Sequence, residues 1–165
     1  MNSPQSVKIL FVCMGNICRS PAAEGIMQTL VRQAGLDDRI VCDSAGTIGY
    51  HTGEKADARM RSHSQKRGYE LLSLSRQFDP GRDFEKFDLI ITMDNHNYKD
   101  VIAMSLDNVS RNKVFRMTNF CKQIKDIHEV PDPYYDGDQG FEMVLDLLED
   151  ACTGLLEYVR KTWNL

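Results

Sequence analysis

A nearly continuous apolar run near the start of the chain leads directly into a tight turn and then a helix. The run is Val7–Val12 (VKILFV), and such a run is typical of a strand buried on both faces of a parallel sheet. Cys13 follows it, Gly15 and Asn16 suit a turn, and Pro21 suits the first turn of a helix, where its missing N–H costs nothing. A buried strand joined so closely to a helix predicts the first β–α unit of an α/β fold.

The same alternation of strand and helix signals continues along the chain. The predicted strands are Val7–Val12, Arg39–Ala45, Phe87–Met93 and Lys113–Met117. Helical patterns are found from Pro21 to Gly35, over Asp57–Arg67, after Asp94 and Asn95, and over Phe141–Val159. A chain of 165 residues is long enough for one domain with a real core. We therefore predict a single doubly wound α/β domain over residues 1–165, with a central four-stranded parallel sheet flanked by helices. Ligands bind at the C-terminal ends of the strands in such folds.

The composition limits the kinds of partner that this chain is expected to bind. A formal net charge of −4 argues against a general nucleic-acid partner, and no apolar stretch approaches the ~20 residues that span a bilayer, so we expect no membrane partner. The chain start lacks a signal-peptide pattern. Five cysteines are an odd number without a paired framework, which favours reduced thiols and a cytoplasmic location. No cluster has metal-ligand spacing, and we expect no metal or cofactor.

The segment Cys13–Ser20 (CMGNICRS) has the residues needed to hold a phosphate beside a reactive thiol. A helix N-terminus offers free N–H groups and roughly half a positive charge, and Gly15 and Asn16 tolerate the left-handed backbone of an anion-binding nest. Arg19 adds a planar fork for two phosphate oxygens. A cysteine at such a site has a pKa of roughly 3.5–7.5 instead of about 8.5, and Ser20 can donate a hydrogen bond to the thiolate. The segment lacks the Gly-Lys-Ser/Thr ending of a nucleotide-binding loop.

This segment closely resembles the signature loop of the low-molecular-weight protein tyrosine phosphatases. The similarity runs from Val7 to about Trp163 and includes Asp43–Gly46, Arg76-Gln77, Phe87–Asp94 and Asp132–Tyr135. The resemblance implies hydrolysis of phosphotyrosine through a phosphocysteine intermediate, without a metal or cofactor. Cys13 would be the nucleophile, Arg19 the phosphate clamp and Asp132 the general acid and base, since a phenol oxygen of pKa about 10 leaves poorly as an anion.

The resemblance also implies roles for the residues around the nucleophile. The substrate-binding set predicted in this way is Met14, Gly15, Asn16, Ile17, Cys18, Ser20, Ser44, Tyr50, Tyr134 and Tyr135. Asn16, Ser20 and Ser44 would form the polar network that shapes the loop, while Ile17 and the three tyrosines would line a slot for a phenyl ring. Many relatives carry a histidine where this chain has Ser73, so we expect the network to be completed differently. We expect His51, His63, His96 and His128 to be surface residues without a catalytic role.

Partners and alternatives follow from the same residues. The expected partners are tyrosine-phosphorylated proteins, with a tyrosine kinase among the candidates, and inorganic phosphate as a product. Protein arginine phosphatases resemble this chain but tend to have threonine in place of Ile17 and lack the tyrosine pair. Thiol-dependent arsenate reductases need a resolving cysteine pair after the third strand, where Cys121 stands alone. A non-catalytic phosphotyrosine-binding module would not need both Cys13 and Asp132. Members of the family also form a reversible disulfide, which here would join Cys13 to Cys18.

Overall fold

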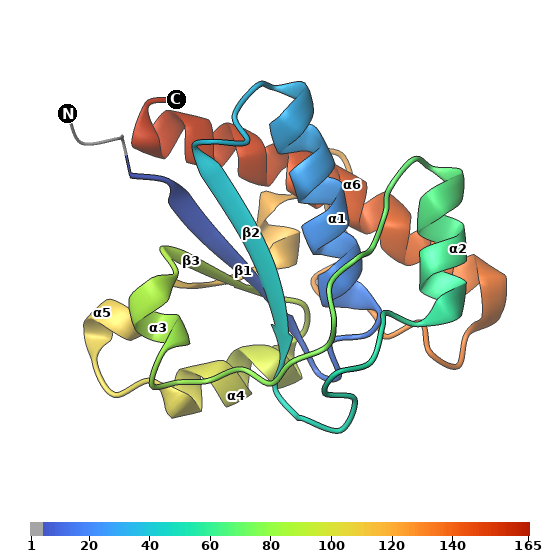
Figure 1. The fold of residues 1–165 in the computed structure, drawn as a ribbon, viewed down its shortest axis with the longest axis horizontal. Helices are drawn as coiled ribbons and strands as arrows, with labels where there is room; N and C mark the ends of the chain where they lie inside the picture. Colours follow the sequence, from blue (N-terminus) through green and yellow to red (C-terminus); the bar gives the residue numbers. More distant parts are fainter. Residues whose placement is uncertain (1–4) are drawn as a thin grey trace.

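A four-stranded parallel sheet forms the centre of the molecule (Figure 1). The computed structural model describes residues 5–165. The strands are β1 (Val7–Cys13), β2 (Ile40–Gly46), β3 (Leu89–Thr92) and β4 (Val114–Arg116), in the order β2-β1-β3-β4. All three pairings are parallel. The predicted fold class and the four-stranded parallel sheet are confirmed.

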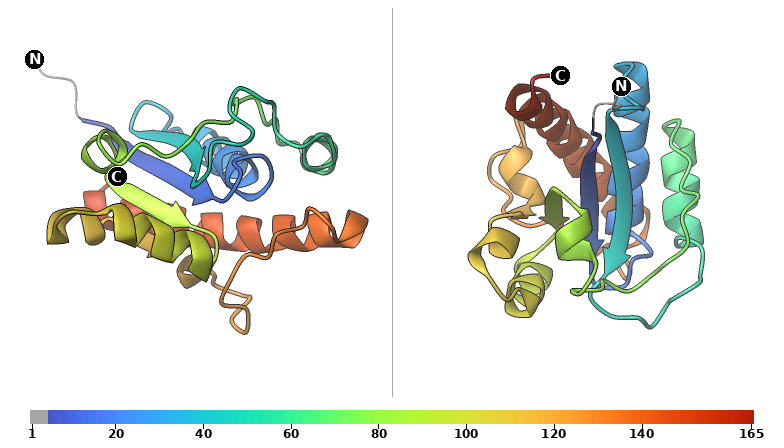
Figure 2. Two further views of the ribbon diagram at one scale, coloured as in Figure 1. Left: turned by 90° about the horizontal axis from the view of Figure 1, so that it is seen from below. Right: turned by 60° about the vertical axis from the view of Figure 1, so that its left-hand side comes forward.

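Helices cover both faces of this sheet, and Figure 2 shows α1 and α4 on opposite sides of it. The helices are α1 (Arg19–Gln33), α2 (Ala58–Lys66), α3 (Asp83–Lys86), α4 (Asn95–Met104), α5 (Asn108–Arg111), the 3₁₀ helix η1 (Met117–Phe120) and α6 (Gly137–Trp163). Buried side chains of α1 and α6 form one core with one face of the sheet. Side chains from α3 and α4 help to form a second core on the other face. Among the described residues, no helix has the length and apolar character that crossing a bilayer requires.

The side chains of β1 explain why this strand lies at the middle of the sheet. Ile9 and Phe11 enter the core beneath α1 and α6, while Leu10 and Val12 enter the core on the opposite face. Successive side chains of a strand point to opposite faces, so a strand that is apolar at nearly every position needs a cover on both sides. All four side chains are completely buried, as the apolar run predicts.

Several element boundaries differ from the sequence prediction by one or more residues; β3, for example, is Leu89–Thr92 and not Phe87–Met93. The fourth strand stops at Arg116, and Met117 begins η1 instead of continuing the strand. Helix α6 starts at Gly137, a turn earlier than the apolar stripe that begins at Phe141. Its first turn is Gly-Asp-Gln-Gly, without an apolar side chain, and Asp138 in it contacts His63 of α2, so hydrophobic periodicity does not reveal it.

Candidate active site

A cavity opens at the edge of the sheet where β1 and β2 end. The loop between β1 and α1 forms its floor, and Asn16 in this loop has the left-handed φ of 57° that the Gly-Asn turn predicts. The residues around the cavity are Cys13, Met14, Gly15, Ile17, Cys18, Arg19, Ile48, Tyr50, His51, Asp132, Tyr134 and Tyr135. The structure therefore brings together the three predicted catalytic residues and most of the predicted substrate-binding residues. Asn16, Ser20 and Ser44 do not line the cavity; their side chains hydrogen-bond to one another instead.

The thiol of Cys13 lies at the bottom of this cavity. Its Sγ is 3.0 Å from Oγ of Ser20, and the residue is only 2 % exposed. Cys13 is the last residue of β1, and α1 begins at Arg19, so its sulfur lies near the positive end of a 15-residue helix. A helix N-terminus and a hydroxyl donor both stabilise a thiolate, which is the nucleophilic form of cysteine.

Arg19 is held from behind by a residue that the sequence analysis did not assign to the site. Its Nη1 donates to Oδ2 of Asp94 at 2.6 Å and to the carbonyl oxygen of Val130 at 3.0 Å. Asp94 follows β3 and caps α4. Burial works to raise the pKa of Asp94, but the hydrogen bonds from Arg19 and from Asn97 outweigh it and hold that pKa below the usual value. Since both bonds of Arg19 use Nη1, its Nε and Nη2 can donate to a phosphate.

Asp132 faces the arginine across the cavity. Its Oδ2 is 3.8 Å from Nη2 of Arg19, and its side chain is 52 % exposed. Its Oδ1 accepts a hydrogen bond from the backbone N–H of Tyr134. The carboxyl group therefore lies beside the guanidinium of Arg19 and is open to water, a position from which a carboxyl group can protonate a leaving oxygen and later accept a proton from water.

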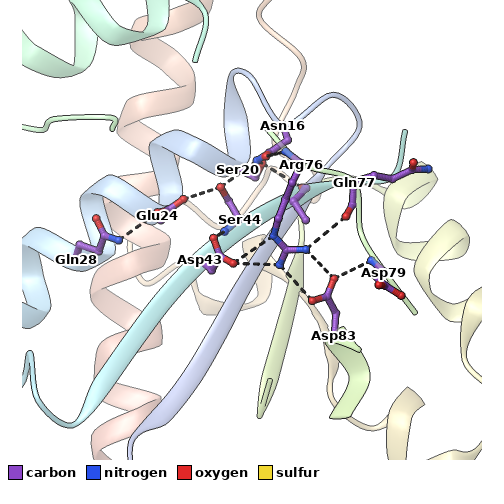
Figure 3. A network of polar contacts seen from close by, with 11 residues as sticks. Asn16, Ser20, Glu24, Gln28, Asp43, Ser44, Arg76, Gln77, Asp79 and Asp83 are labelled. Carbon is purple, nitrogen blue, oxygen red and sulfur yellow. Dashed lines mark hydrogen bonds and ion pairs between the residues drawn. The ribbon is translucent and has the colours of Figure 1, made fainter. Parts of the chain in front are cut away.

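A chain of buried hydrogen bonds runs behind the loop (Figure 3). The amide nitrogen of Asn16 donates to Oγ of Ser20 at 2.8 Å and to Oγ of Ser44 at 3.0 Å. Ser44 in turn donates to Oε1 of Glu24 at 2.6 Å. Because Ser20 accepts from Asn16, its own hydroxyl proton can be donated to the sulfur of Cys13 at 3.0 Å or to the carbonyl oxygen of Ala45 at 3.4 Å. Asn16, Ser20 and Ser44 thus form a connected set of hydrogen bonds, in which Asn16 donates to both serines and Ser44 donates to Glu24.

Glu24 completes this network, and the sequence analysis missed it. Glu24 is only 7 % exposed. This burial raises the pKa of its carboxyl group, and hydrogen bonds from Ser44 and Ser73 partly offset the rise. The carboxyl group of Glu24 thus receives the proton of Ser44, and Ser73, the position at which we expected the network to differ, acts to lower the pKa of the same group. The signal was present in the sequence, because Glu24 lies four residues after Ser20 and therefore on the same face of α1.

A second group of residues supports the loop from the side of β2 (Figure 3). The backbone N–H of Arg76 donates to Oδ1 of Asn16 at 2.9 Å. The guanidinium of Arg76 binds Asp43 at 3.1 Å and Asp83 at 3.0 Å, which anchors the segment to the end of the sheet. At Gly46 a Cβ atom would lie 2.6 Å from the carbonyl oxygen of Met14, so β2 approaches the loop more closely than any side chain allows.

Aromatic and apolar side chains form the rim of the cavity. Tyr134 is 37 % exposed, whereas Tyr50 and Tyr135 are 83 % and 91 % exposed. The rings of Tyr134 and Tyr135 meet edge to face with centroids 4.9 Å apart. Ile17 is half-buried on the cavity wall. The predicted aromatic walls are therefore in place, and Tyr134 is the most firmly packed of the three.

The thiol of Cys18 also lies at the cavity, in reduced form. Both Cys13 and Cys18 are buried free thiols in this structure. Burial, followed by the charge of Asp57, raises the pKa of Cys18 well above its ordinary value. The two neighbouring thiols thus differ in environment, since it is Cys13 whose sulfur lies within hydrogen-bond distance of the Ser20 hydroxyl.

The prediction that all four histidines are surface residues is wrong for His63. His63 is buried, stacks on Phe141 with ring centroids 5.5 Å apart and bonds Glu142 at 2.6 Å. His51 lies on the cavity wall, where its Nδ1 is 2.6 Å from Oε2 of Glu54. The partners of His63 come from α6, far along the chain, so no local pattern announces them. Within residues 5–165, no group of three or more His, Cys, Asp or Glu side chains is placed to hold a metal ion.

Comparison with known proteins agrees with this geometry. The family model described as low molecular weight phosphotyrosine protein phosphatase matches residues 8–164. A putative low molecular weight protein-tyrosine-phosphatase from Synechocystis is 51 % identical over 155 residues, which cover 94 % of this chain and 98 % of the relative. A crystal structure of a protein tyrosine phosphatase from Entamoeba histolytica with Hepes in the active site has a TM-score of 0.91 and 46 % identity, covering 95 % of this chain and 99 % of the other. The Drosophila arginine phosphatase has a TM-score of 0.86 and 31 % identity, covering 93 % and 98 % of the two chains.

Proposed function

The chain belongs to the low molecular weight phosphotyrosine protein phosphatase family, and from that premise we propose that it hydrolyses phosphotyrosine in proteins through a phosphocysteine formed on Cys13. The observation that supports this most directly is the convergence of Cys13, Arg19 and Asp132 on one cavity. A nucleophile, a phosphate-binding cation and a proton donor together are what the reaction needs.

In the first step the thiolate of Cys13 attacks phosphorus and the bond to the phenol oxygen breaks. Arg19 and the N–H groups of the loop hold the phosphoryl oxygens, where preorganised donors stabilise the charge that develops. Asp132 gives its proton to the leaving oxygen. This donation removes the need for a phenolate to leave as an anion.

In the second step a water molecule attacks the phosphocysteine and the phosphorus–sulfur bond breaks. Asp132, now a carboxylate, takes a proton from the water, and the electron pair returns to the sulfur of Cys13. Ser20 donates to that sulfur, so the network from Glu24 to Ser20 supports its departure. The products are inorganic phosphate and the dephosphorylated tyrosine.

The biological setting forms part of the proposal. Tyrosine-phosphorylated proteins are the substrates, and a tyrosine kinase is a candidate among them. A thiol nucleophile must stay reduced to act, and the free thiols of this chain agree with that need. We therefore place the enzyme in a reducing compartment such as the cytoplasm.

The test is turnover of p-nitrophenyl phosphate and of a phosphotyrosine peptide by the wild type and Cys13→Ser. We expect both activities to disappear in Cys13→Ser and to remain in Cys121→Ser, a matched control remote from the cavity. Activity that survives in Cys13→Ser would refute the nucleophile assignment.

Hydrolysis of phosphoarginine is the second candidate function, because the Drosophila arginine phosphatase shares this fold. Ile17 and the pair Tyr134 and Tyr135 on the cavity wall favour a flat aryl ring instead. A comparison of kcat/KM for phosphotyrosine and phosphoarginine peptides of the same sequence tests this choice. A higher value for the phosphoarginine peptide would reverse it.

A further inference from the structure

One arginine outside the catalytic set contacts the aromatic wall from behind. Arg59 lies in the first turn of α2, and its Nη1 donates to the carbonyl oxygen of Tyr134 at 3.0 Å. Its guanidinium carbon is 5.1 Å from the centroid of the Tyr134 ring and 4.9 Å from that of Phe141. Both distances lie within the range of a cation–π contact. Arg59 thus binds both the backbone and the ring of the residue that forms the wall.

The orientation of Arg59 is itself determined by a bidentate partner. Its Nε and Nη2 donate to the two carboxylate oxygens of Asp57, at 3.2 Å and 3.0 Å. Asp57 caps α2 through the backbone N–H groups of Arg59 and Met60, and its own N–H donates to the carbonyl oxygen of Ile17 at 2.8 Å. Bidentate pairs of this kind fix geometry as well as adding energy. A connected path therefore runs from the phosphate-binding loop through Asp57 and Arg59 to Tyr134.

The other end of α2 is anchored on α6. Arg67, just after α2, forms ion pairs with Glu142 and with Glu149. His63 stacks on Phe141, the same ring that Arg59 contacts. Because these contacts hold α2 in place, Arg59 can act as a fixed support for Tyr134.

From these contacts we propose that Arg59 is a positioning residue that determines substrate specificity. It holds the Tyr134 ring as a preformed wall and so raises the preference of the site for aryl phosphates over phosphates without a ring. This inference rests on the proposed phosphatase function. Tyr134 is 37 % exposed, while its neighbour Tyr135 is 91 % exposed; the contacts of Arg59 described above are with Tyr134. A wall ordered before binding lowers the entropy cost of binding a ring, and a small ring-free phosphate gains nothing from it.

A double-mutant cycle with two substrates tests the proposal. The variants are Arg59→Met, Tyr134→Ala and the double variant, and the substrates are a phosphotyrosine peptide and acetyl phosphate, which has no ring. We expect Arg59→Met to lower kcat/KM for the peptide about tenfold, mainly through KM, since it loses one hydrogen bond and one cation–π contact. For acetyl phosphate we expect a change of less than about twofold. In the Tyr134→Ala background, Arg59→Met should have no further effect on the peptide, because coupled residues are not additive.

Two further variants complete the design. Arg61→Met is the matched control, since Arg61 lies on the same helix and its Nε bonds the carbonyl oxygen of Ala56; it should leave both substrates unchanged. Arg59→Lys keeps the charge without the planar fork, so we expect a loss of kcat/KM for the peptide between that of the wild type and that of Arg59→Met. Arg59→Lys also replaces Arg59→Met if the latter does not fold. Equal losses on both substrates, or additive losses in the double variant, would overturn the role of Arg59. A wild type that hydrolyses acetyl phosphate but not the peptide would instead contradict the proposed function.

Discussion

The substitution Gly46→Ala is the sharpest test of how closely β2 supports the phosphate-binding loop. A Cβ atom at Gly46 would lie 2.6 Å from the carbonyl oxygen of Met14 and 3.1 Å from the backbone nitrogen of Asn16. An ordinary contact is at least 3.4 Å, so the carbonyl oxygen must move away by about 0.8 Å. Both contacts are with backbone atoms, and neither can be relieved by rotating a side chain.

This displacement predicts losses in both activity and stability. The loop carries the N–H groups that hold phosphate, and a misplacement of about 1 Å costs on the order of 10²-fold in rate. We therefore expect kcat/KM for p-nitrophenyl phosphate to fall roughly 50- to 100-fold. Forcing an extra methyl group into a packed site costs about 1–3 kcal/mol of unfolding free energy.

The assay is steady-state kinetics combined with urea unfolding of the same preparations. Gly81→Ala is the matched control, because its new Cβ would meet only the side chain of Asp79, at 3.4 Å, and we expect no loss of activity there. Inhibition by inorganic phosphate measures directly how well the loop Cys13–Ser20 binds phosphate. We expect this inhibition to be weaker in Gly46→Ala. If Gly46→Ala keeps the wild-type kcat/KM and phosphate affinity, the close approach of β2 does not determine the conformation of the loop Cys13–Ser20.

Further predictions concern the proposed general acid Asp132, the hydrogen-bond network of Ser44 and Glu24, and the thiol of Cys18. Asp132→Asn should lower kcat about 10²- to 10⁴-fold for a phosphotyrosine peptide and less for p-nitrophenyl phosphate, whose leaving group needs less protonation. Ser44→Ala leaves the buried Asn16 amide short of an acceptor, so unfolding free energy should fall by about 1–3 kcal/mol; an unchanged urea midpoint would contradict this. Because the folded state raises the pKa of Glu24, wild-type stability should fall as pH rises from 4.5 through that pKa, and Glu24→Gln should flatten this slope in urea unfolding at several pH values. Inactivation by peroxide should be reversed by added thiol in the wild type but not in Cys18→Ser; equal recovery in both would exclude a disulfide with Cys18.

The parts of the fold that sequence predicts are those determined by local pattern. The apolar run of β1 requires a cover on both faces, and the α6 stripe requires a single core-facing side. The residues of the loop Cys13–Ser20 that could act on a phosphate all lie within one turn between a strand and a helix, so its proposed role could be predicted from residue order. The end of β4 was predicted less well, because the change to a 3₁₀ helix at Met117 depends on packing against α6.

The support of the site depends on contacts that residue order does not express. Asp94 orients Arg19 from 75 positions away, and Arg59 reaches Tyr134 across the same separation. His63 pairs with Glu142 over 79 positions, which is why it is buried against expectation. Each of these contacts exists only because parallel strands and packed helices bring distant segments to one edge of the sheet.

By itself, the sequence determined a parallel α/β sheet and predicted a nucleophile with its phosphate-binding loop, since strand burial and loop chemistry are properties of neighbouring residues. Only the tertiary structure decided how that loop is held. It placed Glu24 behind Ser44, Asp94 behind Arg19 and Arg59 behind Tyr134, and it left no room for a side chain at Gly46. The physical reason is that buried polar groups need partners at hydrogen-bond distance, and the fold, not the order of residues, determines which partners come within reach.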